Sequence, residues 1–168
     1  FFQTETGIMS PPRSGGFGDL YKKQVDTLHA RLVEAGWPAR TSAAARRTGA
    51  VVLAAAGSRD PEAAEDTGRT ARLLADRLGV PVVPAYASAA APTVAEAVRA
   101  LTAAGRTRVA VASYFTAPGR FATECAKAAP WIASAPLGAH PSMATLILHR
   151  YDEARTTRTS PLPALATT

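Results

Sequence analysis

The sequence has one cysteine and no long apolar run, and these two shortages exclude several classes of protein. Cys125 is the only cysteine among 168 residues, so neither an internal disulfide nor a site made of several thiolates can form within one chain. We expect Cys125 to be a small apolar residue of the core. No apolar stretch approaches the roughly 20 residues that span a bilayer, so we expect no membrane segment. These features indicate a reducing compartment, and we expect the cytoplasm.

Sequence signals for secretion, nucleotide binding and nucleic-acid binding are also missing. Glu5 precedes every basic residue and no apolar h-region follows, which does not resemble a secretory signal. The segment "AAAGSRDPE" lacks two glycines of the dinucleotide fingerprint, and there is no Walker loop. The net charge of +6 favours anionic partners, but the arginines are scattered and no basic strand carries interleaved aromatic residues. We therefore expect an acidic small molecule, and not nucleic acid, as the partner.

Strand and helix patterns alternate regularly from residue 50 to residue 154. The helical segments carry caps: Pro61 stands at a first helical position, and Thr93 with Glu96 forms a capping box. We expect strands at 50–57, 80–88, 108–115 and 131–138, each followed by a helix, with the clearest helices at 61–79, 93–105 and 142–154. Such alternation predicts a three-layer α/β/α domain with a four-stranded parallel sheet, doubly wound as in flavodoxin-like folds.

The two ends of the chain lie outside this alternation. Residues 1–18 mix Thr, Ser, Pro and Gly without period, which predicts a flexible arm. Residues 19–49 are expected to form an N-terminal helix over 19–36 and then a linker. The apolar stripe of that helix is suited to cover a neighbouring copy. Residues 155–168 carry no pattern, and we predict a disordered tail.

The carboxyl end of the first strand carries the first candidate site, because parallel α/β proteins bind ligands at the carboxyl ends of their strands. Gly57, Ser58 and Arg59 offer backbone N–H groups, a hydroxyl and a guanidinium to a carboxylate or a phosphate. The same residues also suit a tight turn in which Ser58 or Asp60 caps the next helix. Both interpretations stay open from sequence.

The end of the third strand carries a second candidate group. Tyr114, Gly119 and Arg120 combine an aromatic ring, a turn and a cation, which suits a flat acidic ligand. Tyr114 is equally well explained as a strand residue packed at its phenol edge. Glu124 follows in the next helix and can accept a proton if it faces the cleft, although a glutamate there also complements the helix dipole.

His140 is the best placed of the three histidines for metal or proton chemistry, because it lies in the loop after the fourth strand. Capping of the last helix is the alternative role that its position favours. Transition-metal sites normally need three or four ligands, so a single histidine predicts no metal site.

Four short motifs, in this order and spacing, resemble the family of sirohydrochlorin and cobalt chelatases. They are "GSRDP", "APTVAEAVRALTAAG", "VAVASYFTAPGRF" and "APLGAHPSM", spread over about residues 51–154. The chain is most similar to the C-terminal half of the two-half actinobacterial members. The resemblance implies a chelatase-like fold and a lyase of tetrapyrrole biosynthesis, of the siroheme or cobalamin type.

The resemblance also implies the ligands and partners of the site. The cleft takes an acidic tetrapyrrole, into which a divalent metal, cobalt or iron, is inserted without ATP; the metal is a substrate, and no tightly bound cofactor is implied. Family members work as paired halves, so we expect a homo-oligomer or a paired chelatase half. The family places one histidine before the Gly-Ser turn and another after the third strand, where this chain has Ala56 and Phe121.

Three functions are left open by these substitutions. The first is a chelatase whose metal-handling groups are unusual, come from a partner subunit or include His140. The second is a non-catalytic half of a chelatase assembly, structural or ligand-binding. The third is a separate α/β enzyme that acts on another small anionic substrate.

Overall fold

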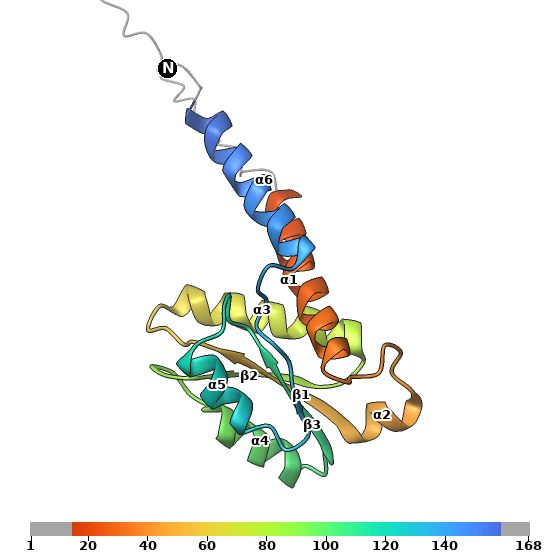
Figure 1. Ribbon diagram of the computed structural model, residues 1–168. Helices are drawn as coiled ribbons and strands as arrows, with labels where there is room; N and C mark the ends of the chain where they lie inside the picture. The colour runs from red at the N-terminus through yellow and green to blue at the C-terminus, as the bar shows by residue number, and fades with distance from the viewer. Residues whose placement is uncertain (1–14, 159–168) are drawn as a thin grey trace, which may run out of the picture.

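The computed structural model describes residues 15–158 and contains a parallel sheet between two layers of helices (Figure 1). The four strands pair in the order β2-β1-β3-β4. Their bounds are β1 (Gly49–Ala55), β2 (Val82–Tyr86), β3 (Arg108–Ser113) and β4 (Ile132–Ala133). All pairs are parallel, which confirms the predicted α/β sheet.

Six helices are seen among the described residues, and four of them cover the two faces of the sheet. Their bounds are α1 (Gly15–Glu34), α2 (Ala43–Thr48), α3 (Pro61–Leu78), α4 (Val94–Ala103), α5 (Arg120–Lys127) and α6 (Pro141–Arg158). Helices α1 and α3 contribute to the core on one face, and α4 and α5 to the core on the other (Figure 1). The outcome is the three-layer architecture that the alternation predicts.

Alternate residues of β1 point to these two cores. Val51 and Leu53 pack with α1 and α3, whereas Val52 and Ala54 pack with α4 and α5. Every residue of β1 is buried, since a central strand covered on both faces meets no solvent. Pro84 interrupts no ladder that the fold needs, because β2 lies at the edge of the sheet.

The helix ends use the caps that the sequence indicates. The Asp60 side chain accepts a hydrogen bond from the N–H of Glu62 at the start of α3. Thr93 and Glu96 form the expected capping box of α4, with the Thr93 N–H donating to Glu96 Oε2 at 2.8 Å. These caps satisfy N–H groups that a helix leaves without intrahelical partners.

The fourth strand is shorter than the sequence predicts. It keeps only two residues, because Pro136 cannot donate to a ladder and the chain turns away after Ser134. The remainder of the predicted strand forms a loop beside the end of β3. There the N–H groups of Leu137 and Gly138 donate to the carbonyl oxygens of Phe115 and Thr116.

The N-terminal region also differs from expectation. Helix α1 begins at Gly15, inside the predicted arm, and α2 lies within the predicted linker. The apolar stripe of α1 is not free to cover a neighbouring copy, because Val25, Leu28 and Leu32 are buried in the chain's own core. A stripe that finds a partner within its own domain buries the same area without a second molecule.

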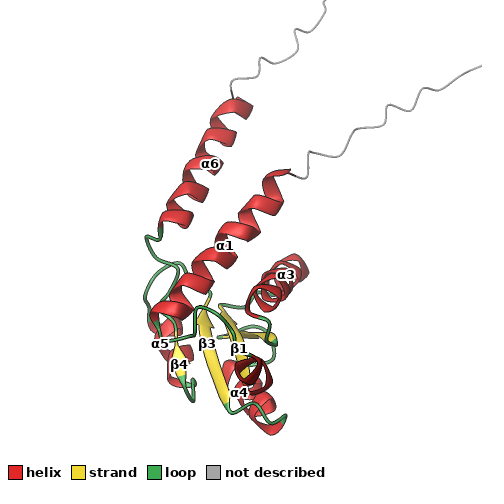
Figure 2. Ribbon diagram, turned by 90° about the vertical axis from the view of Figure 1, so that its right-hand side faces the viewer, coloured by secondary structure: helices red, strands yellow, loops and turns green. Residues whose placement is uncertain are grey.

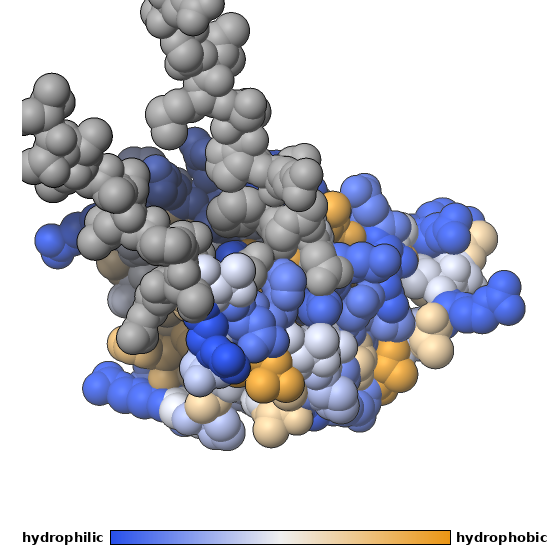
Figure 3. Space-filling view, turned by 90° about the horizontal axis from the view of Figure 1, so that it is seen from above, coloured by the Kyte–Doolittle hydropathy of each residue, from blue (hydrophilic) through white to orange (hydrophobic). Residues whose placement is uncertain are grey.

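At the other end, α6 continues to Arg158, so the first residues of the predicted tail are helical. The remainder of the predicted tail (159–168) and most of the predicted arm (1–14) lie outside the described residues. Helices α1 and α6 lie side by side and extend beyond the sheet (Figure 2). Where Figure 3 shows the surface from above, most residues are hydrophilic and a few apolar residues are scattered among them. No helix within residues 15–158 combines the length and hydropathy needed to cross a bilayer.

Candidate functional site

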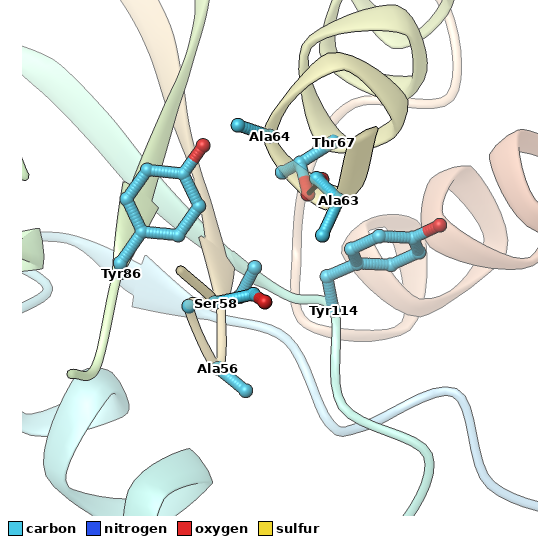
Figure 4. Close-up of a pocket in the computed structure, with 9 residues that line it drawn as sticks. Ala56, Ser58, Ala63, Ala64, Thr67, Tyr86 and Tyr114 are labelled. Atoms are coloured by element: carbon cyan, nitrogen blue, oxygen red, sulfur yellow. Dashed lines mark hydrogen bonds between the residues drawn. The ribbon is translucent and has the colours of Figure 1, made fainter. Parts of the chain in front are cut away.

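A pocket of about 220 Å³ opens where β1, β2 and β3 end (Figure 4). Small side chains of the first turn and of α3 form its floor and one side, and two tyrosines stand on either side of the turn. The lining residues are Ala55, Ala56, Gly57, Ser58, Ala63, Ala64, Thr67, Tyr86 and Tyr114. The pocket therefore lies at the carboxyl edge of the sheet, where ligands of parallel α/β proteins bind.

The floor of the pocket depends on Gly57. Its φ of +92° is a conformation that side chains with a Cβ rarely adopt, and an added Cβ would lie 1.8 Å from the Ser88 carbonyl oxygen. The turns after β1 and β2 are held together here, because the Ser88 N–H donates to the Ala56 carbonyl oxygen at 3.1 Å. Only glycine allows this close approach of two backbones.

Ser58 helps to shape the turn as well as line the pocket. Its Oγ accepts a hydrogen bond from the N–H of Asp60 at 3.0 Å, and Asp60 in turn caps α3. The first turn of α3, which contributes Ala63 and Ala64, is thereby fixed against the pocket. Gly57-Ser58-Arg59 can therefore form a tight turn and still bind a ligand, because Asp60, and not Ser58, caps the helix.

The two tyrosines of the pocket differ in their bonding. Tyr86 is 8% exposed, and its hydroxyl forms no hydrogen bond with the described residues. The Tyr114 hydroxyl points away from the pocket, toward α1, and donates to Gln24 Oε1 at 2.7 Å (Figure 4). Burial is the main cause that raises the pKa of Tyr114, so its phenol stays neutral at physiological pH. Tyr86 thus offers a free hydroxyl to a ligand, and Tyr114 offers the side of a ring.

The two candidate arginines lie outside the pocket lining and differ in their partners. Arg59 is exposed directly after Ser58 and has no ion pair among the described residues. Arg120 begins α5 after the turn at Gly119, and its Nε donates to Glu124 Oε1 at 2.9 Å. Arg59 is therefore available to an anionic ligand, whereas Arg120 and Glu124 neutralise each other on the surface of α5.

Neither predicted proton-transfer residue lines the pocket. His140 Nδ1 accepts a hydrogen bond from the N–H of Ser142 at 3.3 Å and lies 3.4 Å from Thr27 Oγ1. This is the capping arrangement that the sequence leaves open, and it places His140 against Thr27 of α1. Glu124 is occupied by Arg120 on the exposed side of α5.

The positions where the family has histidines carry no metal ligand. Ala56 is exposed on the pocket floor, and Phe121 is 46% exposed on α5, outside the lining. Cys125 is buried in the core beside β3, and burial raises the pKa of its thiol, as expected for a small apolar core residue. Among residues 15–158, no three His, Cys, Asp or Glu side chains gather closely enough to hold a metal ion.

The sequence did not single out five of the lining residues: Ala55, Ala63, Ala64, Thr67 and Tyr86. The alanines and Thr67 carry no chemical signal, because their contribution is the space that small side chains leave at the end of β1 and on one face of α3. Tyr86 had a signal, since it is the aromatic residue at the end of the second strand, in "VPVVPAYAS".

Comparison with known proteins agrees with this fold. The structure is similar to SirB from Bacillus subtilis with Fe3+, with a TM-score of 0.62 and 21% sequence identity. The match covers 82% of this chain and 56% of the SirB chain, so this chain spans little more than half of that structure. No curated protein matches the sequence. The CbiX family matches residues 50–154. Because that match covers more than half of the chain, the protein belongs to the CbiX family, which confirms its resemblance to the sirohydrochlorin chelatases.

Proposed function

We propose that this chain is a tetrapyrrole metal chelatase of the sirohydrochlorin type, which inserts a divalent metal into an acidic macrocycle without ATP. The observation that carries the proposal is the pocket at the carboxyl edge of the sheet, within a domain of the CbiX family. The metal, cobalt or iron, is a substrate of this reaction. The cytoplasm is the proposed location.

The size of the pocket indicates how a macrocycle binds. Pockets that enclose a drug-sized ligand hold about 300–1,000 Å³, and a tetrapyrrole with its carboxylate arms is larger than such a ligand. The volume of about 220 Å³ therefore admits one edge of the ring. The flat faces of Tyr86 and Tyr114 and the small residues between them suit such an edge, and the remainder of the ring lies over the open rim.

Charge at the rim supports an acidic ligand. Arg59 follows the pocket floor and can donate charge-assisted hydrogen bonds to a peripheral carboxylate. The net charge of +6 adds a long-range attraction for anions. The pocket thus offers an apolar slot for the edge of the ring, and Arg59 beside it offers a cation for a carboxylate.

Metal insertion replaces two pyrrole N–H protons by one divalent ion, so two protons must leave the ring. The hydroxyls of Ser58, Thr67 and Tyr86 are the polar side-chain groups that the lining offers to the ring. None is a strong base. The pyrrole protons therefore pass to water or buffer, and the protein contributes by binding and orienting the ring.

A second subunit or a paired half completes the site in this proposal. The pocket is open on one side, and this chain spans 56% of the SirB chain. A paired half over the open rim would cover the part of the macrocycle that the pocket leaves exposed.

The test is an absorption spectrum of the protein mixed with sirohydrochlorin, with and without Co²⁺ or Fe²⁺. We expect a spectral shift on mixing, and then insertion that is faster than in buffer alone. Serum albumin at equal concentration controls for nonspecific binding of an anionic ring. Binding with insertion at the buffer rate would support the non-catalytic half in place of the chelatase, and absence of any shift would refute both.

A further inference from the structure

Helix α1 lies outside the residues that match the CbiX family, yet it contacts a residue of the pocket. The Tyr114 hydroxyl donates to Oε1 of Gln24, a residue on α1 that is 90 positions away in the chain, at 2.7 Å. We infer that Gln24 is a positioning residue of the macrocycle site, which holds the ring of Tyr114 as a wall of the pocket. The inference rests on the proposed function of the pocket.

The hydrogen bonds around Tyr114 single out Gln24 as the partner that fixes the ring. Thr70 Oγ1 also lies near the phenol oxygen, but at 3.4 Å, and it donates its own proton to the Asp66 carbonyl oxygen at 3.0 Å. The single phenol proton goes to the nearer acceptor, and 2.7 Å is the usual length of an O–H···O bond. At 3.4 Å, Thr70 Oγ1 is a much weaker acceptor for the phenol proton than Gln24 Oε1 at 2.7 Å.

The orientation of Tyr114 shows what this bond does for the pocket. Its hydroxyl points toward α1, and its ring stands beside Ala63, opposite Tyr86 (Figure 4). A ring held at its far end by Gln24 cannot swing into the space between the two tyrosines. A released ring would fill part of a volume of only about 220 Å³, which the edge of the macrocycle needs.

Helix α1 is fixed by other contacts, so the effect of Gln24 can be separated from loss of the helix. The Tyr21 hydroxyl donates to the Asp66 carboxylate of α3, and the Arg77 guanidinium of α3 donates to Asp26 at 2.6 Å. The buried stripe of α1 adds a large apolar contact. Truncating Gln24 leaves these contacts in place.

The experiment measures the Kd of metal-free sirohydrochlorin, by absorption or fluorescence quenching, for a set of variants of the full chain. Gln24→Ala should weaken binding by about fivefold, the effect of losing one hydrogen bond. Gln24→Glu keeps an acceptor for the phenol proton and should restore affinity to near the wild-type value. Thr102→Ala, which removes an exposed hydroxyl on α4, is the control and should change nothing.

A double-variant cycle separates positioning from a general loss of stability. Tyr114→Phe keeps the ring but removes the hydroxyl, so adding Gln24→Ala to it should cause no further loss of affinity. Additive losses, or equal affinity of wild type and folded Gln24→Ala, would overturn the inference and leave the proposed function intact. If the wild type does not bind the macrocycle at all, the proposed function falls, and this inference falls with it.

Discussion

Gly57 shows how one residue decides whether the pocket has its shape. Its backbone conformation and the nearby Ser88 carbonyl oxygen leave no room for a Cβ. We therefore expect Gly57→Ala to lower the free energy of unfolding by about 2–4 kcal/mol, from backbone strain and a forced shift of the turn. Urea denaturation measures this change.

Gly105 offers a matched control for that prediction. It also has a positive φ, of +83°, but nothing lies within 4 Å of an added Cβ. Gly105→Ala should cost only the conformational strain, about 1 kcal/mol. Equal effects of the two substitutions would show that the contact with Ser88 is unimportant.

Ala56 stands where the resembled family has a histidine, and its exposed position on the pocket floor leaves space for an imidazole. Ala56→His should raise the rate of metal insertion by on the order of 10²-fold, because a general base would then accept the pyrrole protons. Initial rates with Co²⁺ and sirohydrochlorin give the comparison. An unchanged rate, with the macrocycle bound as before, would show that proton removal does not limit insertion.

Arg59 and Arg120 both follow the ends of strands, so the sequence predicts that they contribute equally to ligand binding. The structure favours Arg59, because Arg120 is paired with Glu124. Arg59→Ala should weaken macrocycle binding by about 1.5 kcal/mol, the low end for a charge-assisted hydrogen bond, because the side chain is exposed. Arg120→Ala should cost less.

Arg99→Ala, on the exposed surface of α4, is the control for the same fluorescence titration. Arg77 is unsuitable for this purpose, because it is paired with Asp26 of α1. If all three arginine variants bind equally well, the rim plays no part in recognition.

The rule that ligands bind at the carboxyl ends of parallel strands locates the site from sequence, but it does not say where the side chains of the site point. Gly57, Ser58 and Tyr114 line the pocket, while His140 and Glu124, which lie further beyond their strand ends, face elsewhere. Local partners cause the difference. The N–H of Ser142 donates to the His140 imidazole, and Arg120, one helical turn away, donates to the Glu124 carboxylate. Such pairings depend on loop geometry that periodicity does not encode.

At the scale of elements, apolar periodicity predicted the central strands well, because each is a buried run bounded by turn residues. The predicted bounds are wrong where a proline or a helix cap, and not apolar periodicity, decides the local structure. Pro136 ended β4 early, and α2 formed in a segment read as a linker, where Ser42 caps a single short helix. For α1 the stripe was recognised, but sequence alone could not tell whether it would pack on its own domain or on a neighbour.

The packing of α1 on α3 predicts a dependence of stability on pH. His29 lies on α1, and its pKa is lowered by burial first and then by Arg77, with Asp26 acting in the opposite direction. The folded state therefore holds the His29 proton less tightly than the unfolded state. Stability that is present above about pH 6.5 is lost as the pH falls below that value.

His29→Gln removes this titration. The difference in Tm between pH 7.5 and pH 5.5 should be smaller for the variant than for the wild type. Identical differences in thermal melts would show that His29 is not responsible.

At the scale of the whole molecule, the carboxyl edge of the sheet carries an open pocket with the exposed Arg59 beside it. The two long helices α1 and α6 extend beyond the sheet (Figure 2). The family match covers residues 50–154, and α1 precedes it while still contributing to the pocket through Gln24. The site therefore depends on an element outside the part of the chain that the family describes. We therefore assign the proposed function to the pocket, and not to a cluster of metal ligands.

The most direct test of that claim is the initial rate of Co²⁺ insertion into sirohydrochlorin by the wild type and by Ala64→Trp. Ala64 is an exposed residue of α3 that lines the pocket, so tryptophan there fills the slot without disturbing the core. Ala100→Trp, exposed on α4, is the matched control. We expect insertion above the protein-free rate for the wild type and for Ala100→Trp, and loss of this acceleration in folded Ala64→Trp. Equal rates for the wild type and Ala64→Trp, or no acceleration by either, would contradict it.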